Sequence, residues 1–269
     1  MSDFFKDKVV AITGGSDGIG KGLIDALIPL GAKIATCGRN QDKLYDLQVQ
    51  YADKLLHTFV CDVSSFEDCK KFIDSTLKTF GGIDILINNA GISMRSLFED
   101  ADLNVIKKVM DVNFYGTVNC TKLALPSIIE RKGCIVGISS IAGYRGLPGR
   151  TGYSASKFAL TGFLEALRVE LAEKDVNVMW VCPGFTTSNI RNVALNSTGN
   201  SQGESPMDEG KMMSAYQCAL HIIKAIEKKK RTLVLTFTGK RAVFMNRFFP
   251  AWTDKLIRKF YFKNGELTK

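Results

Sequence analysis

The sequence has few of the residues that build metal sites and disulfide frameworks. Only two of its 269 residues are histidines, His57 and His221, so a histidine-based metal site or a Ser-His-Asp triad has almost no raw material. The cysteines number seven, an odd count, and they form no Cys-x-x-Cys pair. We therefore expect no metal site, free thiols and a reducing compartment.

A long apolar run is also missing. No stretch approaches the roughly 20 apolar residues that a membrane-spanning helix needs. Residues 1–8 carry acids and lysines where a signal peptide has its apolar core. We therefore expect a cytoplasmic protein that is soluble or held at a membrane surface. The length and the hydrophobic share of 45% fit one large domain with a sizeable core.

Apolar runs and amphipathic segments alternate along most of the chain. Strands that are apolar throughout are covered on both faces, which is typical of a parallel sheet. The pattern predicts an α/β fold with one Rossmann-type doubly wound parallel sheet and helices on both faces. We expect strands at 8–13, 32–37, 56–61, 83–87, 134–138, 176–181 and 232–236, and helices at 18–30, 41–51, 66–80, 103–130, 153–173 and 212–227.

The first expected strand ends in a glycine-rich turn, with Gly14, Gly18 and Gly20 closely spaced before a helix. Such a turn lets the backbone approach a pyrophosphate, whose charge then lies at the helix N-terminus. The spacing departs from the commoner Gly-x-Gly-x-x-Gly. Taken alone, the glycines are a weak signal, and a structural turn without a ligand is the alternative.

Tyr153 and Lys157 lie four residues apart in an expected helix, so their side chains share a face. A phenol with a pKa of about 10 ionises readily only where positive charge stabilises the phenolate. The Lys157 ammonium provides such a charge, and the pair indicates a proton donor. A purely structural Tyr-x-x-x-Lys pair is the alternative.

Five motifs together resemble the short-chain dehydrogenase/reductase family over residues 8–236. They are Thr13-Gly14-x-x-x-Gly18-x-Gly20, Asn88-Asn89-Ala90-Gly91, Ser140, Tyr153-x-x-x-Lys157 and Pro183-Gly184. The resemblance implies an oxidoreductase that interconverts a ketone and a secondary alcohol. It implies a catalytic tetrad in which Ser140 binds the carbonyl, with Ser139 as its rival, and Asn113 positions a water near the lysine; that tetrad is Asn113, Ser140, Tyr153 and Lys157.

The resemblance also implies a nicotinamide cofactor. After the second strand Gly38 replaces the acid that would bind a ribose hydroxyl, and Arg39 follows, which favours NADP(H). Asp17 stands where many NADP-binding relatives carry a basic residue. Asp62 has the alternative of capping the next helix. The implied cofactor positions are Gly14, Ser16, Gly18, Ile19, Gly20, Arg39, Asp62, Val63, Asn89, Ala90, Gly91, Tyr153, Lys157, Pro183, Gly184, Thr186 and Ser188.

Residues 240–269 differ in composition from the expected catalytic domain, 1–239. Between 240 and 263, seven Lys or Arg and seven aromatic residues accompany one acid, and we expect Pro250 to divide the segment into two short helices. Cations mixed with aromatics suit an interfacial helix on anionic lipid. The alternative is a tail packed over the substrate site or across a dimer. No nucleic-acid-binding module accompanies the net charge of +9, so we expect no such partner.

Within the family, the chain looks most similar to membrane-associated reductases of lipid-like ketones. These include acyl-dihydroxyacetone-phosphate reductases, 11β-hydroxysteroid dehydrogenases and 3-ketodihydrosphingosine reductase. The resemblance implies an apolar ketone, selected by the loop at about 185–211 and the tail, and a homodimer or homotetramer joined through helices 103–130 and 153–173. A 3-oxoacyl-[acyl-carrier-protein] reductase and a non-catalytic NADP(H)-sensing protein are the alternatives.

Overall fold

A seven-stranded parallel sheet forms the centre of the molecule. The computed structural model describes residues 3–268 except 53, 206, 209 and 211. Within this part the sheet has the order β3-β2-β1-β4-β5-β6-β7, and all its neighbouring strands are parallel. The expected fold class is thus confirmed. The strands are β1 Val9–Thr13, β2 Lys33–Gly38, β3 Leu56–Val60, β4 Ile85–Asn88, β5 Cys134–Ile138, β6 Asn177–Cys182 and β7 Thr232–Val234.

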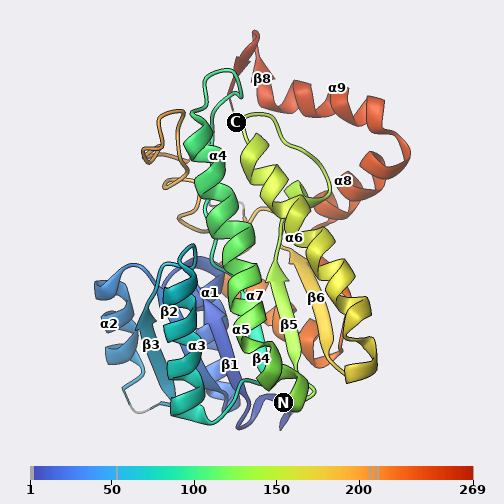
Figure 1. Cartoon of the computed structure of the whole chain (residues 1–269). Coiled ribbons are helices and arrows are strands. Elements are labelled where there is room, and N and C mark those ends of the chain that lie inside the picture. The colour runs from blue at the N-terminus through green and yellow to red at the C-terminus, as the bar shows by residue number, and fades with distance from the viewer. Residues whose placement is uncertain (1–2, 53, 206, 209, 211, 269) are drawn as a thin grey trace.

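Helices cover both faces of this sheet (Figure 1). One face carries α3 (Phe66–Phe80), α4 (Leu103–Met110), α5 (Gly116–Glu130) and α6 (Thr151–Glu170) over one buried apolar cluster. The other face carries α1 (Gly18–Leu27), α2 (Gln41–Gln50) and α7 (Ala215–Glu227) over a second cluster. All residues of β1 and β5 are buried because both sides of these strands meet helices.

The helix expected over 103–130 is continuous but not uniform. A π-helical turn, Asp111–Tyr115, joins α4 to α5 and contains Asn113. The helix expected over 18–30 ends at Leu27 and continues as a 3₁₀ turn, Ile28–Leu30, because Pro29 cannot supply the amide proton of an α-helical bond. The helix expected from 212 begins at Ala215, after the capping box of Ser214 and Gln217.

The strand order reverses at β1, which lies between β2 and β4. In doubly wound sheets, ligands bind beyond the carboxyl ends of the strands beside such a reversal. The tail helices α8 (Phe237–Phe248) and α9 (Pro250–Tyr261) lie at this end of the molecule, followed by the hairpin of β8 (Phe262–Lys263) and β9 (Glu266–Leu267) (Figure 1). None of the described helices is long and apolar enough to cross a membrane.

Candidate active site

A cavity of about 890 Å³ opens at the carboxyl ends of the strands. Gly20 and Asn113 lie outside its lining: Gly20 packs against Gly14 and Asn89. The remaining predicted site residues all line the cavity, namely Gly14, Ser16, Gly18, Ile19, Arg39, Asp62, Val63, Asn89, Ala90, Gly91, Ser140, Tyr153, Lys157, Pro183, Gly184, Thr186 and Ser188. The described residues hold no group of three or more potential metal ligands.

The glycine turn after β1 brings bare backbone to this cavity. Gly14 and Gly18 have φ values of 69° and 51°, in the left-handed region that favours glycine. A Cβ on Gly14 would lie 2.9 Å from Ala90 Cα, so the loop after β4 needs a glycine there. Asn89 Nδ2 holds the two loops together by donating to the carbonyl oxygens of Thr13 and Gly14. The turn leads into the N-terminus of α1, a combination that fits the pyrophosphate of a dinucleotide.

Two cations line the cavity where β2 leads into α2. Arg39 is exposed, and Lys43 Nζ donates a 2.6 Å hydrogen bond to Asp17 Oδ2. Asp17 also caps α1, because its Oδ1 accepts from the backbone N–H of Gly18. Sequence reasoning found Arg39 but missed Lys43. A basic residue one helical turn after Arg39 was the signal that could have found it.

Asp62 lines the cavity after β3 without capping the next helix. Its Oδ1 accepts hydrogen bonds from the backbone N–H and the hydroxyl of Ser64, at 3.0 and 2.7 Å. Ser65 is the N-cap of α3 and accepts from the N–H of Asp68. The alternative role of Asp62 as a helix cap is therefore wrong.

Tyr153 and Lys157 lie together on the buried face of α6. The Lys157 Nζ lies 5.7 Å from the centroid of the Tyr153 ring. It donates a 2.8 Å hydrogen bond to the Ile138 carbonyl at the end of β5. Burial disfavours the charged ammonium and lowers the pKa of Lys157 to about 8.

The surroundings of Tyr153 act on its phenol in both directions. Burial is the largest effect and raises its pKa, whereas a hydrogen bond with Ser140 and the charges of Arg150 and Arg191 act in the lowering direction. The net shift is upward, so the phenol keeps its proton at neutral pH. Tyr153 therefore has a proton to donate, and groups beside it are arranged to stabilise the phenolate that donation leaves.

The hydroxyl groups of Ser139 and Ser140 point to different neighbours. Ser139 is buried, and its Oγ lies 3.2 Å from Thr161 Oγ1 and 3.4 Å from the Lys157 carbonyl. Ser140 is half-buried and hydrogen-bonds with Tyr153, and its Oγ accepts from the N–H of Ala142. The geometry thus distinguishes the two candidates, and Ser140 is the serine beside the phenol.

Asn113 is tied to the walls of the site. Its Oδ1 accepts from the N–H of Ile92 at 2.8 Å, and its Nδ2 donates to the Ile92 carbonyl and to Ser156 Oγ, both at 2.9 Å. Ser156 in turn donates to the Tyr153 carbonyl. The amide therefore links the loop after β4 to the turn of α6 that carries Tyr153, a positioning contact that sequence reasoning did not anticipate.

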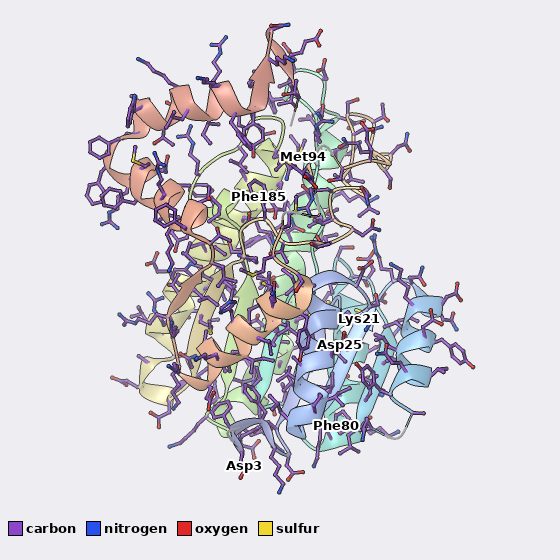
Figure 2. The ribbon with its side chains drawn as sticks, turned by 180° about the vertical axis from the view of Figure 1, so that it is seen from behind. Asp3, Lys21, Asp25, Phe80, Met94 and Phe185 are labelled. Atoms are coloured by element: carbon purple, nitrogen blue, oxygen red, sulfur yellow. The ribbon has the colours of Figure 1, made fainter. Side chains whose placement is uncertain are left out.

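The far end of the cavity is built from residues that sequence reasoning missed. Arg150 precedes α6 and Arg191 follows β6, and both line this end. The tail supplies another wall, since α9 turns Ile257 and Tyr261 toward the cavity. Phe185, labelled in Figure 2, lies between the sheet and the tail. These contacts join segments far apart in the chain, and no local sequence signal marks them.

Comparison with known proteins agrees with this architecture. The sequence profile described as short chain dehydrogenase matches residues 8–198. Dehydrogenase/reductase SDR family member 7B of Rattus norvegicus is 35% identical over 259 residues, which cover 92% of this chain and 79% of the rat protein.

Two solved structures share the fold. A short-chain dehydrogenase/reductase from Burkholderia phymatum in complex with NAD has a TM-score of 0.83 and 20% identity, covering 94% of this chain and 96% of its own. A short-chain dehydrogenase from Streptomyces avermitilis has a TM-score of 0.80 and 25% identity, covering 95% of this chain and 99% of its own. This chain belongs to the short-chain dehydrogenase/reductase family of oxidoreductases, whose members use nicotinamide cofactors.

Proposed function

We propose that this protein is an NADP(H)-dependent reductase that converts a lipid-like ketone into a secondary alcohol, with Tyr153 as the proton donor. The observation that carries the proposal is the arrangement of Tyr153, Ser140 and Lys157 on one wall of the cavity that also receives the glycine turn. Both halves of a reduction, cofactor binding and proton donation, then take place in one cavity.

In the proposed reaction Ser140 donates a hydrogen bond to the substrate carbonyl and holds it beside the phenol. Bound NADPH supplies the hydride that the carbonyl carbon takes up. Tyr153 gives its proton to the carbonyl oxygen, and the Lys157 ammonium stabilises the resulting phenolate. Asn113 holds the turn of α6 that carries Tyr153 beside the loop after β4, through its hydrogen bonds with Ser156 and Ile92.

The test of the chemistry is Tyr153→Phe. We expect turnover to fall by ~10²–10⁴-fold, the usual contribution of acid–base catalysis, while NADPH binding, followed by quenching of tryptophan fluorescence, survives. Tyr115→Phe is the matched control, since Tyr115 is exposed and lies outside the cavity lining. Retained turnover in Tyr153→Phe would remove this residue from the mechanism. Retained binding with no turnover of any ketone by the wild type would favour the sensing alternative.

The preference for NADP(H) rests on Arg39 and on the residue before it, because position 38 is a glycine and not an acid. A guanidinium binds a phosphate through paired donors, which a ribose hydroxyl does not use. We expect Arg39→Ala to raise the KM for NADPH far more than the KM for NADH. Equal effects on the two cofactors would contradict the assignment.

We further propose that the tail contacts the surface of an anionic membrane. The outer sides of α8 and α9 carry Phe244, Phe248 and Trp252, which are 56%, 57% and 59% exposed, and aromatic rings project from the tail in Figure 2. Lys240, Arg241, Arg247, Lys255, Arg258 and Lys259 lie among them. The inner side of α9 meanwhile packs on the protein through Thr253 and Tyr261. The tail is therefore suited both to close the cavity and to face lipid.

Flotation with phosphatidylserine vesicles tests this contact. We expect the wild type to float with these vesicles and the triple variant F244S/F248S/W252S to stay in solution. The matched control is Y45S/F66S/F98S, which removes three aromatic side chains that are also well exposed but lie outside the tail. Equal flotation of the two triple variants would defeat the proposal.

We also propose that the helices α4, α5 and α6 join subunits into a homodimer or homotetramer. Phe158 on α6 is 47% exposed and available for such a contact, whereas Leu167 is buried in the core of this subunit. We expect Phe158→Ser to weaken the assembly, so that its mass in a sedimentation experiment is lower than that of the wild type. An unchanged, monomeric mass for both would contradict the proposed assembly.

A further inference from the structure

The charges that line the cavity are distributed unevenly. Among the described lining residues, Asp17 and Asp62 are the acids, and they follow β1 and β3. Arg150 and Arg191 lie on the side of β6 and the tail, where none of the described lining residues is an acid. The proposed substrate end is therefore cationic.

Arg150 is a cation without an anionic partner among the residues that the structure describes. It takes part in none of the ion pairs of the described residues. Its Nε is buried without a hydrogen-bond partner. Its charge reaches two phenols of the cavity wall, since it acts to lower the pKa of both Tyr153 and Tyr261. A guanidinium in this position gains from an anion that enters the cavity, because burying a cation without a partner is unfavourable.

Arg191 brings a second guanidinium to the same place. Arg191 is only 7% exposed, and its Nη2 donates a 2.8 Å hydrogen bond to the Thr186 carbonyl. This bond fixes the side chain beside the active site, where its charge also acts on Tyr153. The charges of two guanidinium groups from different segments thus act on the phenol that would protonate the ketone.

Apolar side chains also line this part of the cavity. Its lining includes Leu147, Val193, Leu195, Ala242, Ile257 and Phe260. Apolar side chains beside two guanidinium groups match a ligand that has a hydrocarbon part and a charged part. A cationic amine near the carbonyl would be repelled, and a neutral ketone would offer Arg150 no anion.

We propose that Arg150, supported by Arg191, binds a phosphate or carboxylate group of the ketone substrate while the apolar wall receives its hydrocarbon chain. The inference rests on the proposed reductase function and names its substrate class, an anionic amphiphilic ketone. Among the lipid-like ketones that the sequence leaves open, it favours those that carry an anion and disfavours those that carry an amine.

Matched substrates test the proposal. Long-chain ketones of equal length that carry a phosphate, a carboxylate, a neutral hydroxyl or an amine near the carbonyl are reduced with NADPH, and kcat/KM is measured for each. We expect an anionic ketone to exceed the neutral one and the amine to rank last. The phosphate and carboxylate arms show which anion is preferred. A neutral or amine ketone that equals or exceeds both anions would overturn the proposal.

Arg150→Met locates the effect. We expect it to lower the ratio of kcat/KM for the better anionic ketone to kcat/KM for the neutral ketone by ~10–100-fold, as the loss of a charged hydrogen-bond partner implies. A general effect on Tyr153 cancels in this ratio. Arg95→Met is the matched control, because Arg95 also has a buried Nε without a partner but lies outside the cavity lining. An unchanged ratio in Arg150→Met would overturn the proposal.

A binding measurement separates this inference from the proposed reaction. Calorimetry compares a long-chain alkyl phosphate and a long-chain alkyl carboxylate with the alcohol of equal length. We expect the wild type to prefer an anion and Arg150→Met to lose that preference. Preference for an anion without turnover of any ketone would count against the reductase function and support the anion site. Turnover of a ketone without a preference for the anion would support the reductase function and count against the anion site.

Discussion

Lys43 donates a 2.6 Å hydrogen bond from Nζ to Oδ2 of Asp17, which joins the first turn of α2 to the N-cap of α1. Asp17 stands where a basic residue is common among NADP-binding relatives, and Lys43 supplies a positive charge at the same place from another helix. Both side chains are about half exposed, at 45% and 46%. Exposed ion pairs contribute only ~0–1 kcal/mol, so Lys43 can exchange Asp17 for a stronger anion at little cost.

We predict that this pair takes part in the choice of cofactor. Lys43→Ala leaves the Asp17 carboxylate uncompensated, so we expect the KM for NADPH to rise by roughly tenfold, the effect of one lost charged contact, with a smaller rise for NADH. Asp17→Asn keeps a helix cap but removes the negative charge, so the KM for NADPH should fall. Steady-state kinetics with both cofactors measure these values.

Lys21→Ala is the control for this prediction. Lys21, labelled with Asp25 in Figure 2, pairs with that aspartate on α1 as Lys43 pairs with Asp17. Lys21 lies outside the cavity lining. The KM values of the Lys21→Ala variant for both cofactors should equal those of the wild type. A rise in the KM for NADPH in Asp17→Asn, or equal shifts for both cofactors in Lys43→Ala, would contradict the role of the pair.

The pH dependence of the reduction should follow Lys157. Its pKa is lowered to about 8 by burial, so the ammonium loses its proton as the pH rises through that value. Tyr153 has a raised pKa and stays protonated over the same range. We therefore expect kcat for ketone reduction to be constant below about pH 7 and to fall above about pH 8, because a neutral lysine no longer stabilises the phenolate.

Initial rates at saturating NADPH from about pH 6 to about pH 10 give this profile. The oxidation of the alcohol should show the opposite trend, because Tyr153 must then begin as the phenolate. A reduction rate that stays level to about pH 10, the ordinary range of a lysine pKa, would show that Lys157 does not carry the effect.

The sequence predicts best what local chemistry decides. The helix expected at 66–80 agrees with α3 at both ends, since Ser65 caps its start and Gly81 adopts the left-handed conformation at its end. The strand expected at 134–138 agrees with β5, whose residues are apolar throughout. The glycine turn and the pair of Tyr153 and Lys157 are likewise short patterns in which spacing implies geometry.

What the sequence does not predict depends on contacts between distant segments. Lys43 meets Asp17 only because β2 places α2 beside α1, and Tyr261 meets the charge of Arg150 only because α9 folds back over the start of α6. The π-helical turn at Asn113 has no signature in the helical pattern of 103–130. It arises in a segment where Asn113 bonds to Ile92 after β4, a partner that periodicity cannot reveal.

Asn113→Leu should destabilise the protein as well as inactivate it. Asn113 is 1% exposed and satisfies both the N–H and the carbonyl of Ile92, which the variant leaves unpaired. Each buried polar group without a partner costs ~1–3 kcal/mol, so we expect the free energy of unfolding to fall by ~2–5 kcal/mol in urea titrations. Asn104→Leu, at an exposed position of α4, should change it by less than about 0.5 kcal/mol. A stable but inactive Asn113→Leu would indicate a chemical role instead of a positioning one.

The contact between α1 and α7 should tolerate no side chain at Gly22. A Cβ there would lie 2.7 Å from the Ala215 carbonyl oxygen and 3.0 Å from the Tyr216 nitrogen, atoms of the backbone at the start of α7 that cannot rotate away. We therefore expect Gly22→Ala to lower the free energy of unfolding by ~1–3 kcal/mol, the range for overpacked sites. Gly162→Ala is the matched control, because Gly162 is also helical but its Cβ would meet nothing within 4 Å. That variant should gain ~0.4–1 kcal/mol from the lower entropy of its unfolded chain. Because α7 follows the loop that lines the cavity, a Gly22→Ala protein as stable as the wild type would mean that α7 can move away from α1. Such movement would be visible as a raised KM for the ketone.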